Sequence, residues 1–381
     1  MLKQRTKIIP IFVPHQGCPH DCIFCNQKKI TGVSTNVTTA EVEKIIEESL
    51  EGIDKSANIE IAFFGGSFTA IDIQIQKELL SVAKRYIEKG FVNYIRISTR
   101  PDCIDENILK MLKEYKVEVI ELGVQSLDEE VLEKSNRGHS VECVIKSANL
   151  IKKFGFKLGL QMMVGLPGDN GTKCMMTAKK FVELKPDCVR IYPTLVLKDT
   201  GLEKILETKE YKCFTLNECR NIVKKILVLF TINDINVIRV GLQATDEIQE
   251  GEAVVGGPYH PAFRQLVESD IIKDYIEYLI KDKEKYCVKH QTSVKILCNK
   301  KIISTIVGNK KENIEFFTKN YGIKLSVVDS LIYKDVELPK DTIEIILSYD
   351  KNNEIEAIEE NFKISIEEIY NIMSKEYETT I

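Results

Sequence analysis

The sequence predicts an α/β fold in which six strand–helix units follow one another and build a parallel sheet. Segments rich in Ile and Val recur along the first 200 residues, and segments with helical periodicity lie between them. The predicted strands are KIIPIFVP from Lys7, IEIAFFGGSF from Ile59, YIRISTRP from Tyr94, VEVIELGVQS from Val117, FKLGLQMMVGLPG from Phe156 and CVRIYPTLV from Cys188. Six units fit an open doubly wound sheet or an incomplete barrel, and both place functional residues at the carboxyl ends of the strands.

The segments between these strands carry helix signals. Thr38 precedes the first helical segment and Glu41 stands three residues later, which is the spacing of a capping box. Gly90 and Gly155 end two later segments, as glycine commonly does at helix C-termini. The later helical segments are IQIQKELLSVAKRYIEKG, DENILKMLKEY, VECVIKSANLIKKFG and TKCMMTAKKFVELKP.

The last third of the chain has a different character. A long helix is expected from Thr215 and another strand from Ile235. From about Tyr286 the sequence predicts a strand, a hairpin, a second strand, a helix and a further strand. We therefore expect a core with its C-terminal extension over residues 1–282 and a small α/β accessory domain over residues 283–381, with the boundary near Lys283.

The composition is that of an ordinary soluble protein. Of 381 residues, 44% are hydrophobic and 29% are charged, and the net charge of -4 produces no general basic field for nucleic acid. No segment approaches the roughly 20 apolar residues of a membrane span. Pro10 and Pro14 break the apolar run near the N-terminus, so no signal peptide is expected. These features predict a cytoplasmic protein with reduced cysteines and no membrane partner. They contain no information on the oligomeric state.

Three cysteines stand close together directly after the first predicted strand. Cys18, Cys22 and Cys25 have the spacing C-x3-C-x2-C, which in a reducing compartment indicates a metal site or catalysis rather than a disulfide. A 4Fe–4S cluster normally takes four thiolates, so three would leave one iron open to another ligand. Zinc is the alternative, because a structural zinc site takes four Cys or His ligands and His15 or His20 would complete it.

Small or polar residues follow several other predicted strands. They are Gly65, Gly66 and Ser67 after the second strand, Gln125 and Ser126 after the fourth, and Gln161 in the segment that ends the fifth. Two adjacent glycines expose backbone groups to a small ligand, although such a pair is also common in tight turns. Because the carboxyl ends of parallel strands share one edge of the sheet, we expect a site at that edge.

This combination resembles the radical SAM superfamily. The resemblance rests on C-x3-C-x2-C, with the aromatic Phe24 before the third cysteine, and on the Gly-Gly turn after the second strand. It implies a partial (β/α)6 barrel and a 4Fe–4S cluster whose open iron binds S-adenosylmethionine (SAM). It also implies cleavage of SAM to a 5′-deoxyadenosyl radical, with one electron supplied by a donor such as flavodoxin or ferredoxin.

The resemblance also implies a set of site residues. The cluster ligands are Cys18, Cys22 and Cys25. The residues near SAM are Phe24 beside the adenine and Gly65 and Gly66 beside the methionine amino group. Ser67 stands where the family often has Glu. Gln125, Ser126 and Gln161 are expected SAM or substrate contacts by position alone, and Arg100 is an expected SAM contact because of its charge and its place after the third strand.

Three of the charged residues have two interpretations each. Arg100 pairs with the cofactor carboxylate or a phosphate, or it forms an ion pair with Asp102 or Asp105. Arg137 and His139, in the segment NRGHS, face the substrate, or they belong to a polar turn between two helices.

Further segments are similar to the catalytic-subunit family of the Elongator complex and its bacterial relatives. They are STRPD from Ser98, ELGVQS from Glu121, NRGHS from Asn136 and RIYPTLVLKDTGL from Arg190, and the resemblance spans roughly Lys7 to Ser269. It implies action on the wobble uridine of tRNA, together with an acetyl-CoA-binding acetyltransferase domain. The segment after about Tyr286 shows no pattern for a CoA pyrophosphate loop, so we expect a relative that lacks this domain.

The sequence thus predicts a radical SAM enzyme that acts on tRNA or another RNA. One alternative is a radical SAM enzyme for a small molecule or tetrapyrrole, because a similar cysteine segment occurs in radical SAM porphyrinogen oxidases. The other is a zinc-stabilised RNA-binding protein without catalysis. Metal content separates the last from the first two, and salt-dependent RNA binding separates the first two from each other.

Overall fold

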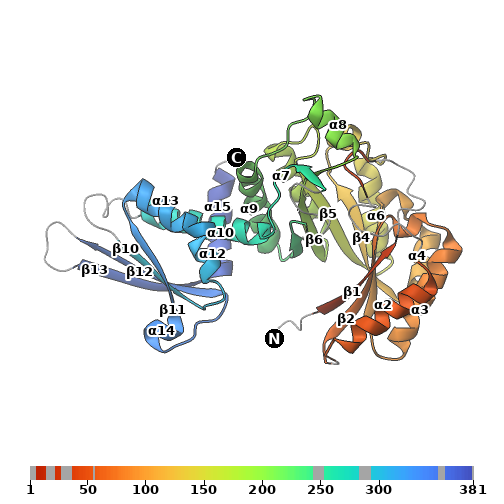
Figure 1. Cartoon of the computed structure of the whole chain (residues 1–381), viewed down its shortest axis with the longest axis horizontal. Coiled ribbons are helices and arrows are strands. Elements are labelled where there is room, and N and C mark those ends of the chain that lie inside the picture. The colour runs from red at the N-terminus through yellow and green to blue at the C-terminus, as the bar shows by residue number, and fades with distance from the viewer. Residues whose placement is uncertain are drawn as a thin grey trace. The chain divides into compact units, whose positions relative to one another are not determined.

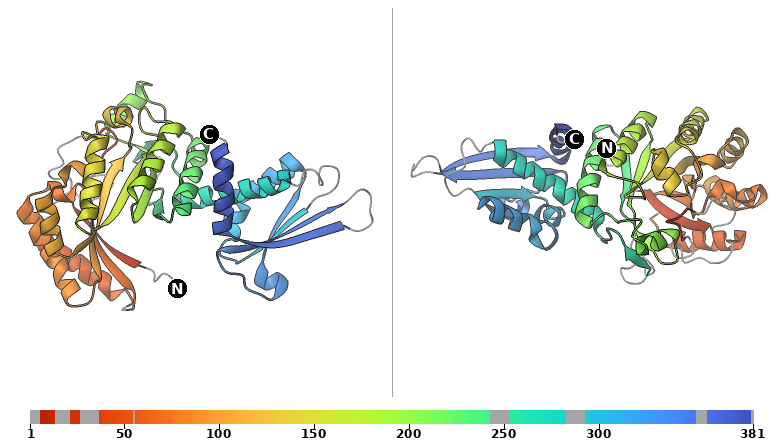
Figure 2. Two further views of the ribbon diagram at one scale, coloured as in Figure 1. Left: turned by 180° about the vertical axis from the view of Figure 1, so that it is seen from behind. Right: turned by 90° about the horizontal axis from the view of Figure 1, so that it is seen from above.

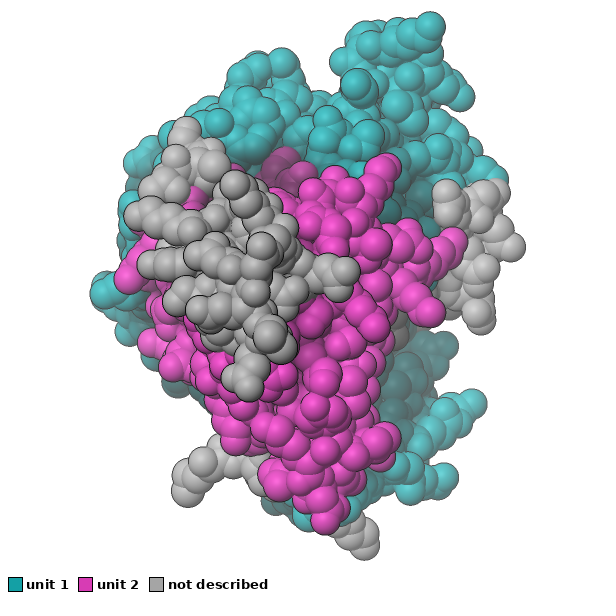
Figure 3. Space-filling model, turned by 90° about the vertical axis from the view of Figure 1, so that its left-hand side faces the viewer, with its two compact units in different colours: residues 1–219, 235–261 teal, residues 220–234, 262–381 magenta. Residues whose placement is uncertain are grey.

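A computed structural model describes residues 6–13, 22–26, 37–54, 56–242, 253–282, 293–350 and 357–379. The chain forms two compact units, residues 1–219 with 235–261 and residues 220–234 with 262–381 (Figure 3). Residues 262–282 thus belong to the C-terminal unit. The domain boundary expected near Lys283 lies outside the described residues.

The first unit is built on one parallel sheet (Figure 1). In the described part of the chain the sheet has seven strands in the order β1-β2-β3-β4-β5-β6-β8. They are β1 (Thr6–Val13), β2 (Asn58–Gly65), β3 (Tyr94–Thr99), β4 (Val117–Gln125), β5 (Lys157–Val164), β6 (Cys188–Pro193) and β8 (Asn236–Val240). The predicted partial (β/α)6 barrel is confirmed, and β8 adds a strand beside β6.

Helices cover the outer face of this sheet (Figure 2). They are α2 (Thr39–Glu51), α3 (Ile73–Glu88), α4 (Glu106–Glu114), α5 (Glu129–Lys134), α6 (Val141–Lys153) and α7 (Gly171–Leu184). The predicted capping box of α2 is present, because Glu41 N donates to Thr38 Oγ1 at 3.2 Å and Thr38 N donates to Glu41 Oε2 at 2.8 Å. On β1, the buried Ile9 and Ile11 alternate with exposed residues, as expected for a strand with one face under helices.

The opposite face of the sheet is concave. The guanidinium of Arg190 on β6 lies 5.2 Å from the ring centre of Phe64 on β2. Three strands separate β2 from β6 in the sheet order, so these side chains meet only because the sheet curls toward this face. The face that carries Phe64 and Arg190 is therefore the inside of the partial barrel.

Shorter elements complete the first unit after β6. They are β7 (Val196–Leu197), α8 (Gly201–Glu207) and β9 (Val254–Gly256), and β7 pairs with β9 in an antiparallel ribbon. The one-turn helices η1 (Phe68–Ala70) and η2 (Pro101–Cys103) follow β2 and β3. Helix α9 (Leu216–Ile232) begins in the first unit and continues into the second.

The second unit contains a mixed sheet with the order β11-β10-β12-β13. Its elements are α10 (Phe263–Asp282), β10 (Ser293–Cys298), α12 (Ile303–Val307), η3 (Asn309–Lys311), α13 (Glu312–Tyr321), β11 (Lys324–Asp329), α14 (Ser330–Lys334), β12 (Thr342–Asp350), β13 (Ala357–Ser365) and α15 (Ile366–Thr379). Arg220 links three helices, since its guanidinium pairs with Asp270 on α10 at 2.8 Å and with Glu312 on α13 at 2.9 Å.

One local prediction for this unit is wrong. The sequence predicts a hairpin and a second strand directly after the first strand, but the segment after β10 forms the short helix α12. Strand β10 pairs instead with β11 in parallel and with β12 in antiparallel, so both of its edges are occupied. Tertiary pairing therefore overrides the β propensity of this Ile-rich segment. Among the described residues, no helix has the length and apolar character needed to cross a membrane.

Candidate active site

The segment Cys22–Asn26 forms a tight turn that the backbone holds in place. Cys25 N donates to Cys22 O at 2.9 Å, which closes the turn. Ile23 N donates to the carbonyl of Ser135 at 3.2 Å, and Leu202 N donates to Ile23 O at 2.7 Å. The turn is thus held between the end of α5 and the start of α8. Its two cysteines have positions set by the protein scaffold.

Only part of the predicted cysteine cluster is described. Cys22 is buried and Cys25 is partly buried. Cys18 lies outside the described residues, and among the described residues no three metal-binding side chains come together. The assignment of all three cysteines as cluster ligands therefore stays a prediction.

Phe24 packs against apolar side chains in this structure. Together with Ile23 it contacts a small buried cluster formed by Val196, Leu202 and Tyr211. These contacts orient the turn between Cys22 and Cys25. The expected position of Phe24 beside adenine stays a prediction.

Two arginines surround the thiol of Cys22. Arg137 Nη1 donates to Cys22 Sγ at 3.3 Å, and Arg100 Nη1 approaches the same sulfur at 3.7 Å. Arg100 Nη2 also donates to the carbonyl of Arg137 at 2.6 Å, which connects the two arginines. Arg100 pairs with both carboxylate oxygens of Asp102 at 2.9 and 3.0 Å, so the predicted ion pair is confirmed. A contact between Arg100 and SAM stays a prediction.

His139 lies in the same positively charged environment. Burial, together with the charges of Arg137 and Arg100, lowers the pKa of His139 to about 4. The imidazole is therefore neutral at pH 7. Within the described residues, its Nε2 and the Nε of Arg137 are buried polar atoms without a hydrogen-bond partner. Buried polar atoms are rarely left without partners in native proteins, so this region fits a bound ligand.

The glycine turn after β2 is required by its backbone. Gly65 has φ +108°, and a Cβ built there would lie 2.4 Å from the carbonyl oxygen of Val13. Gly66 N donates to the same oxygen at 3.1 Å. The two glycines thus allow the end of β2 to approach β1 closely, directly before the cysteine segment. Their contact with the methionine amino group stays a prediction.

The hydroxyl of Ser67 connects the ends of two strands. It accepts a hydrogen bond from Arg100 N at 3.0 Å and pairs with the hydroxyl of Thr99 at 2.8 Å. Thr99 also pairs with the hydroxyl of Thr69 at 2.6 Å. Ser67 is buried, so its side chain stabilises the turn on which Arg100 stands. A role in binding SAM stays a prediction.

The two predicted glutamines lie next to each other, whereas Ser126 has other partners. Gln161 Nε2 donates to Gln125 Oε1 at 3.1 Å. Gln125 has φ +71°, a left-handed conformation that is strained for a residue with a side chain and is often found at functional sites. Ser126 accepts a hydrogen bond from Asp128 N at 3.2 Å and lies 3.4 Å from the hydroxyl of Thr177. Ser126 therefore stabilises the entry to α5.

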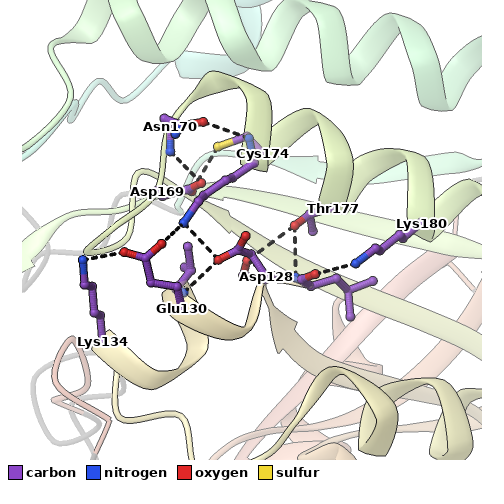
Figure 4. A network of polar contacts seen from close by, with 12 residues as sticks. Asp128, Glu130, Lys134, Asp169, Asn170, Cys174, Thr177 and Lys180 are labelled. Carbon is purple, nitrogen blue, oxygen red and sulfur yellow. Dashed lines mark hydrogen bonds and ion pairs between the residues drawn. The ribbon is translucent and has the colours of Figure 1, made fainter.

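The loop after β5 is fixed by a network around Asp169 (Figure 4). The Asp169 carboxylate accepts hydrogen bonds from Gly165 N at 3.0 Å and from the thiol of Cys174 at 3.0 Å. Burial raises the pKa of the Asp169 carboxyl, and these hydrogen bonds oppose that rise. On the same side, Lys173 bridges Asp128 at 3.1 Å and Glu130 at 2.5 Å, which joins α7 to α5. The network holds this loop at the edge of the sheet where the cysteine turn lies.

A buried charge layer on the concave face was not predicted from the sequence. We use this name for Glu60, Arg96, Glu121 and Arg190, one residue from each of four strands. Arg96 pairs with both oxygens of Glu60 at 3.0 Å and also contacts Glu121. Arg190 pairs with both oxygens of Glu121 at 2.8 and 3.2 Å. Burial lowers the pKa of Arg96, but the two carboxylates outweigh this effect and raise it above the usual value. Opposite charges in the middle of strands otherwise rich in Ile and Val were the available signal.

Comparison with known proteins places this site in a family. The model of the radical SAM superfamily matches residues 12–181, and the model of the radical SAM C-terminal domain matches residues 186–273. The uncharacterized protein MJ0486 of Methanocaldococcus jannaschii is 33% identical over 233 residues, which are 58% of this chain and 71% of that protein. The chain belongs to the radical SAM superfamily.

Two other relatives of this radical SAM protein have names that refer to tRNA modification or to the Elongator complex. The tRNA uridine(34) acetyltransferase of M. jannaschii is 32% identical over 260 residues, which cover 57% of this chain and 47% of that protein. Human Elongator complex protein 3 is 35% identical over 262 residues, which cover 57% of this chain and 48% of that protein. The predicted relationship to the Elongator catalytic subunit is confirmed, and the chain spans about half the length of these two relatives.

A solved structure agrees with the fold. Elp3 of Methanocaldococcus infernus, without residues 1–46, aligns over 94% of this chain and 78% of its own with a TM-score of 0.54 and 20% identity. The predicted enzyme class and cofactors are also confirmed: the protein is a radical SAM enzyme, and its cofactors are a 4Fe–4S cluster and SAM.

Proposed function

We propose that this radical SAM enzyme modifies RNA and that tRNA is its substrate. The observation that carries the proposal is the 32% identity over 260 residues to a protein named tRNA uridine(34) acetyltransferase. The match covers 47% of that relative. The proposal therefore concerns a radical reaction on RNA and does not extend to the acetyl transfer in the relative's name.

Within this proposal, Cys18, Cys22 and Cys25 bind the cluster. The environment of Cys22 supports this assignment, because two guanidinium groups donate hydrogen bonds to its sulfur and would compensate the negative charge of a bound cluster. Among the described residues, the Nε of Arg137 and the Nε2 of His139 are buried without hydrogen-bond partners, which leaves polar capacity for a ligand in this region. When bound there, the cluster would supply the electron for cleavage of SAM to a 5′-deoxyadenosyl radical.

The chain's own residues position the reactants. The turn that carries Cys22 and Cys25 is held by backbone hydrogen bonds and by the packing of Phe24, so little reordering is needed when a ligand binds. Gln125 and Gln161 supply amide donors and acceptors for polar groups of SAM or of a nucleotide. We propose flavodoxin or ferredoxin as the electron donor.

The first experiment tests the chemistry. Protein purified without oxygen is analysed for iron, sulfide and zinc, then reduced with dithionite in the presence of SAM. We expect about four irons per chain, as a 4Fe–4S cube requires, and formation of 5′-deoxyadenosine. Cys22→Ala should lose both, whereas Cys143→Ala, which truncates a partly buried cysteine on α6, should keep both. About one zinc per chain without iron would contradict the cluster assignment.

The second experiment tests the substrate. The loaded enzyme, SAM and reductant are incubated with unmodified tRNA, and the nucleosides are analysed by mass spectrometry. We expect a nucleoside of changed mass that requires Cys22, and tRNA binding that weakens steeply as salt concentration rises. Formation of 5′-deoxyadenosine without any change in tRNA, but with turnover of a small molecule such as a porphyrinogen, would overturn the RNA proposal and leave the radical chemistry intact.

A further inference from the structure

Arg137 differs from the other buried arginines in the described chain. Arg96, Arg100 and Arg220 each pair with at least one carboxylate at 3.0 Å or less. Arg137 is 7% exposed, and no carboxylate lies within ion-pair distance of it among the described residues. A buried charge without a counter-ion is costly, so such a charge implies an anion beside it.

The contacts of Arg137 identify that anion. Its Nη2 donates to the carbonyl of Gly123, which is neutral, and its Nε has no partner in the described part of the chain. Its Nη1 donates to Cys22 Sγ at 3.3 Å. Of the described groups that the Arg137 side chain contacts, only this thiol can carry a negative charge, either as a thiolate or as part of a cluster.

A second guanidinium strengthens the field at the same sulfur. Arg100 Nη1 lies 3.7 Å from Cys22 Sγ, and Arg100 Nη2 holds the Arg137 carbonyl at 2.6 Å. Asp102 neutralises much of the Arg100 charge through its two contacts with the guanidinium. The uncompensated positive charge beside Cys22 therefore comes mainly from Arg137.

We propose that Arg137, supported by Arg100, raises the reduction potential of the iron–sulfur cluster through the Cys22 sulfur. The inference rests on the proposed function, in which Cys22 binds the cluster. Reduction adds one electron from the donor protein and makes the cluster one charge more negative. A fixed positive charge and N–H donors at a ligand sulfur stabilise the reduced form more than the oxidised form. Arg137 thereby makes the cluster easier to reduce before SAM is cleaved.

The test is a potentiometric titration of reconstituted protein followed by electron paramagnetic resonance, with iron and sulfide measured for each variant. Arg137→Gln removes the charge and keeps a polar side chain. At the midpoint potential of the unmodified protein, we expect the ratio of reduced to oxidised cluster in Arg137→Gln to be about tenfold lower. This corresponds to a midpoint potential lower by about 59 mV for a one-electron couple. Arg85→Gln, which removes a half-exposed arginine on α3, is the control and should leave the potential unchanged.

A second variant predicts a shift of opposite sign. Asp102→Asn removes the carboxylate that neutralises Arg100, so the potential should rise. Asp102 is partly exposed, so this variant also provides the test if Arg137→Gln does not take up iron. Full cluster content with unchanged potentials in both variants would overturn the inference and leave the proposed function standing. No iron in the unmodified protein would instead remove the proposed function, and with it this inference.

Discussion

The charge layer and the surroundings of Cys22 are two polar regions of the same curled sheet, and their charges are balanced differently. In the charge layer, Arg96 and Arg190 face Glu60 and Glu121, and each guanidinium has a carboxylate within 3.0 Å. Around Cys22, the Arg137 side chain contacts only a thiol and a carbonyl among the described residues, and His139 is buried and neutral. In the charge layer every guanidinium is paired with a carboxylate without any ligand. In the region around Cys22, hydrogen-bonding groups remain that a ligand could use.

The difference in charge balance distinguishes a region that stabilises the fold from a region suited to binding a ligand. A network of balanced charges holds strands together and has no remaining capacity for a substrate. An unbalanced positive region beside a cysteine suits an anionic group such as a thiolate-bound cluster. We therefore assign the charge layer to the stability of the partial barrel and the surroundings of Cys22 to chemistry.

The largest expected effect concerns the charge layer. Glu121→Gln leaves Arg190 without its carboxylate and Arg96 with one instead of two. Breaking a buried ion pair from one side should lower the free energy of unfolding by about 3 kcal/mol. Urea unfolding of the cluster-free protein, followed by circular dichroism, measures this change.

Glu118→Gln is the matched control for that measurement. Glu118 lies on the same strand, but it pairs with Lys157 at the surface. Exposed ion pairs contribute little, so the change should stay below about 1 kcal/mol. Equal losses in the two variants would contradict the contrast between the charge layer and a surface pair.

A smaller effect is expected from the pH response of His139. Its pKa is about 4 in the folded chain against an ordinary value of 6.5. Between these values the unfolded chain binds a proton that the folded chain does not, so lowering the pH favours unfolding. His139 stabilises the fold above pH 6.5, and this stability is lost as the pH falls toward 4.

The corresponding variant is His139→Gln, compared with the unmodified cluster-free protein by urea unfolding at pH 7.5 and pH 5. The unmodified protein should lose about 2 kcal/mol more than the variant between these two pH values. The same loss in both proteins would show that His139 titrates normally, and the region around Cys22 would then be less positive than we infer.

The smallest expected effect concerns the turn that carries Arg100. Thr99→Val keeps the shape of the side chain and removes its hydrogen bonds to Ser67 and Thr69. We expect a loss of about 1 kcal/mol in the free energy of unfolding. A double-mutant cycle with Ser67→Ala checks the cause, because the two changes should be less than additive if the hydroxyl pair contributes.

Much of the fold could be predicted from the sequence. Alternating Ile- and Val-rich strands and periodic helices indicated the parallel sheet, and the spacing of Thr38 and Glu41 indicated the start of α2. The curl of the sheet and the place of β8 beside β6 could not be predicted in this way. Both depend on how distant strands pair, and no local pattern carries that information.

The candidate site divides along the same line. The cysteine spacing and the glycine pair are short-range features, because a turn of a few residues sets the distance between its own side chains. The amino-acid sequence alone determined these two features. Arg137 stands 115 residues from Cys22, and Arg190 stands 69 residues from Glu121. Their contacts exist only because parallel crossovers bring strand ends together and the sheet curls until side chains from β4 and β6 meet. The balance of charge, which separates the structural layer from the chemical site, is therefore a property of the folded chain.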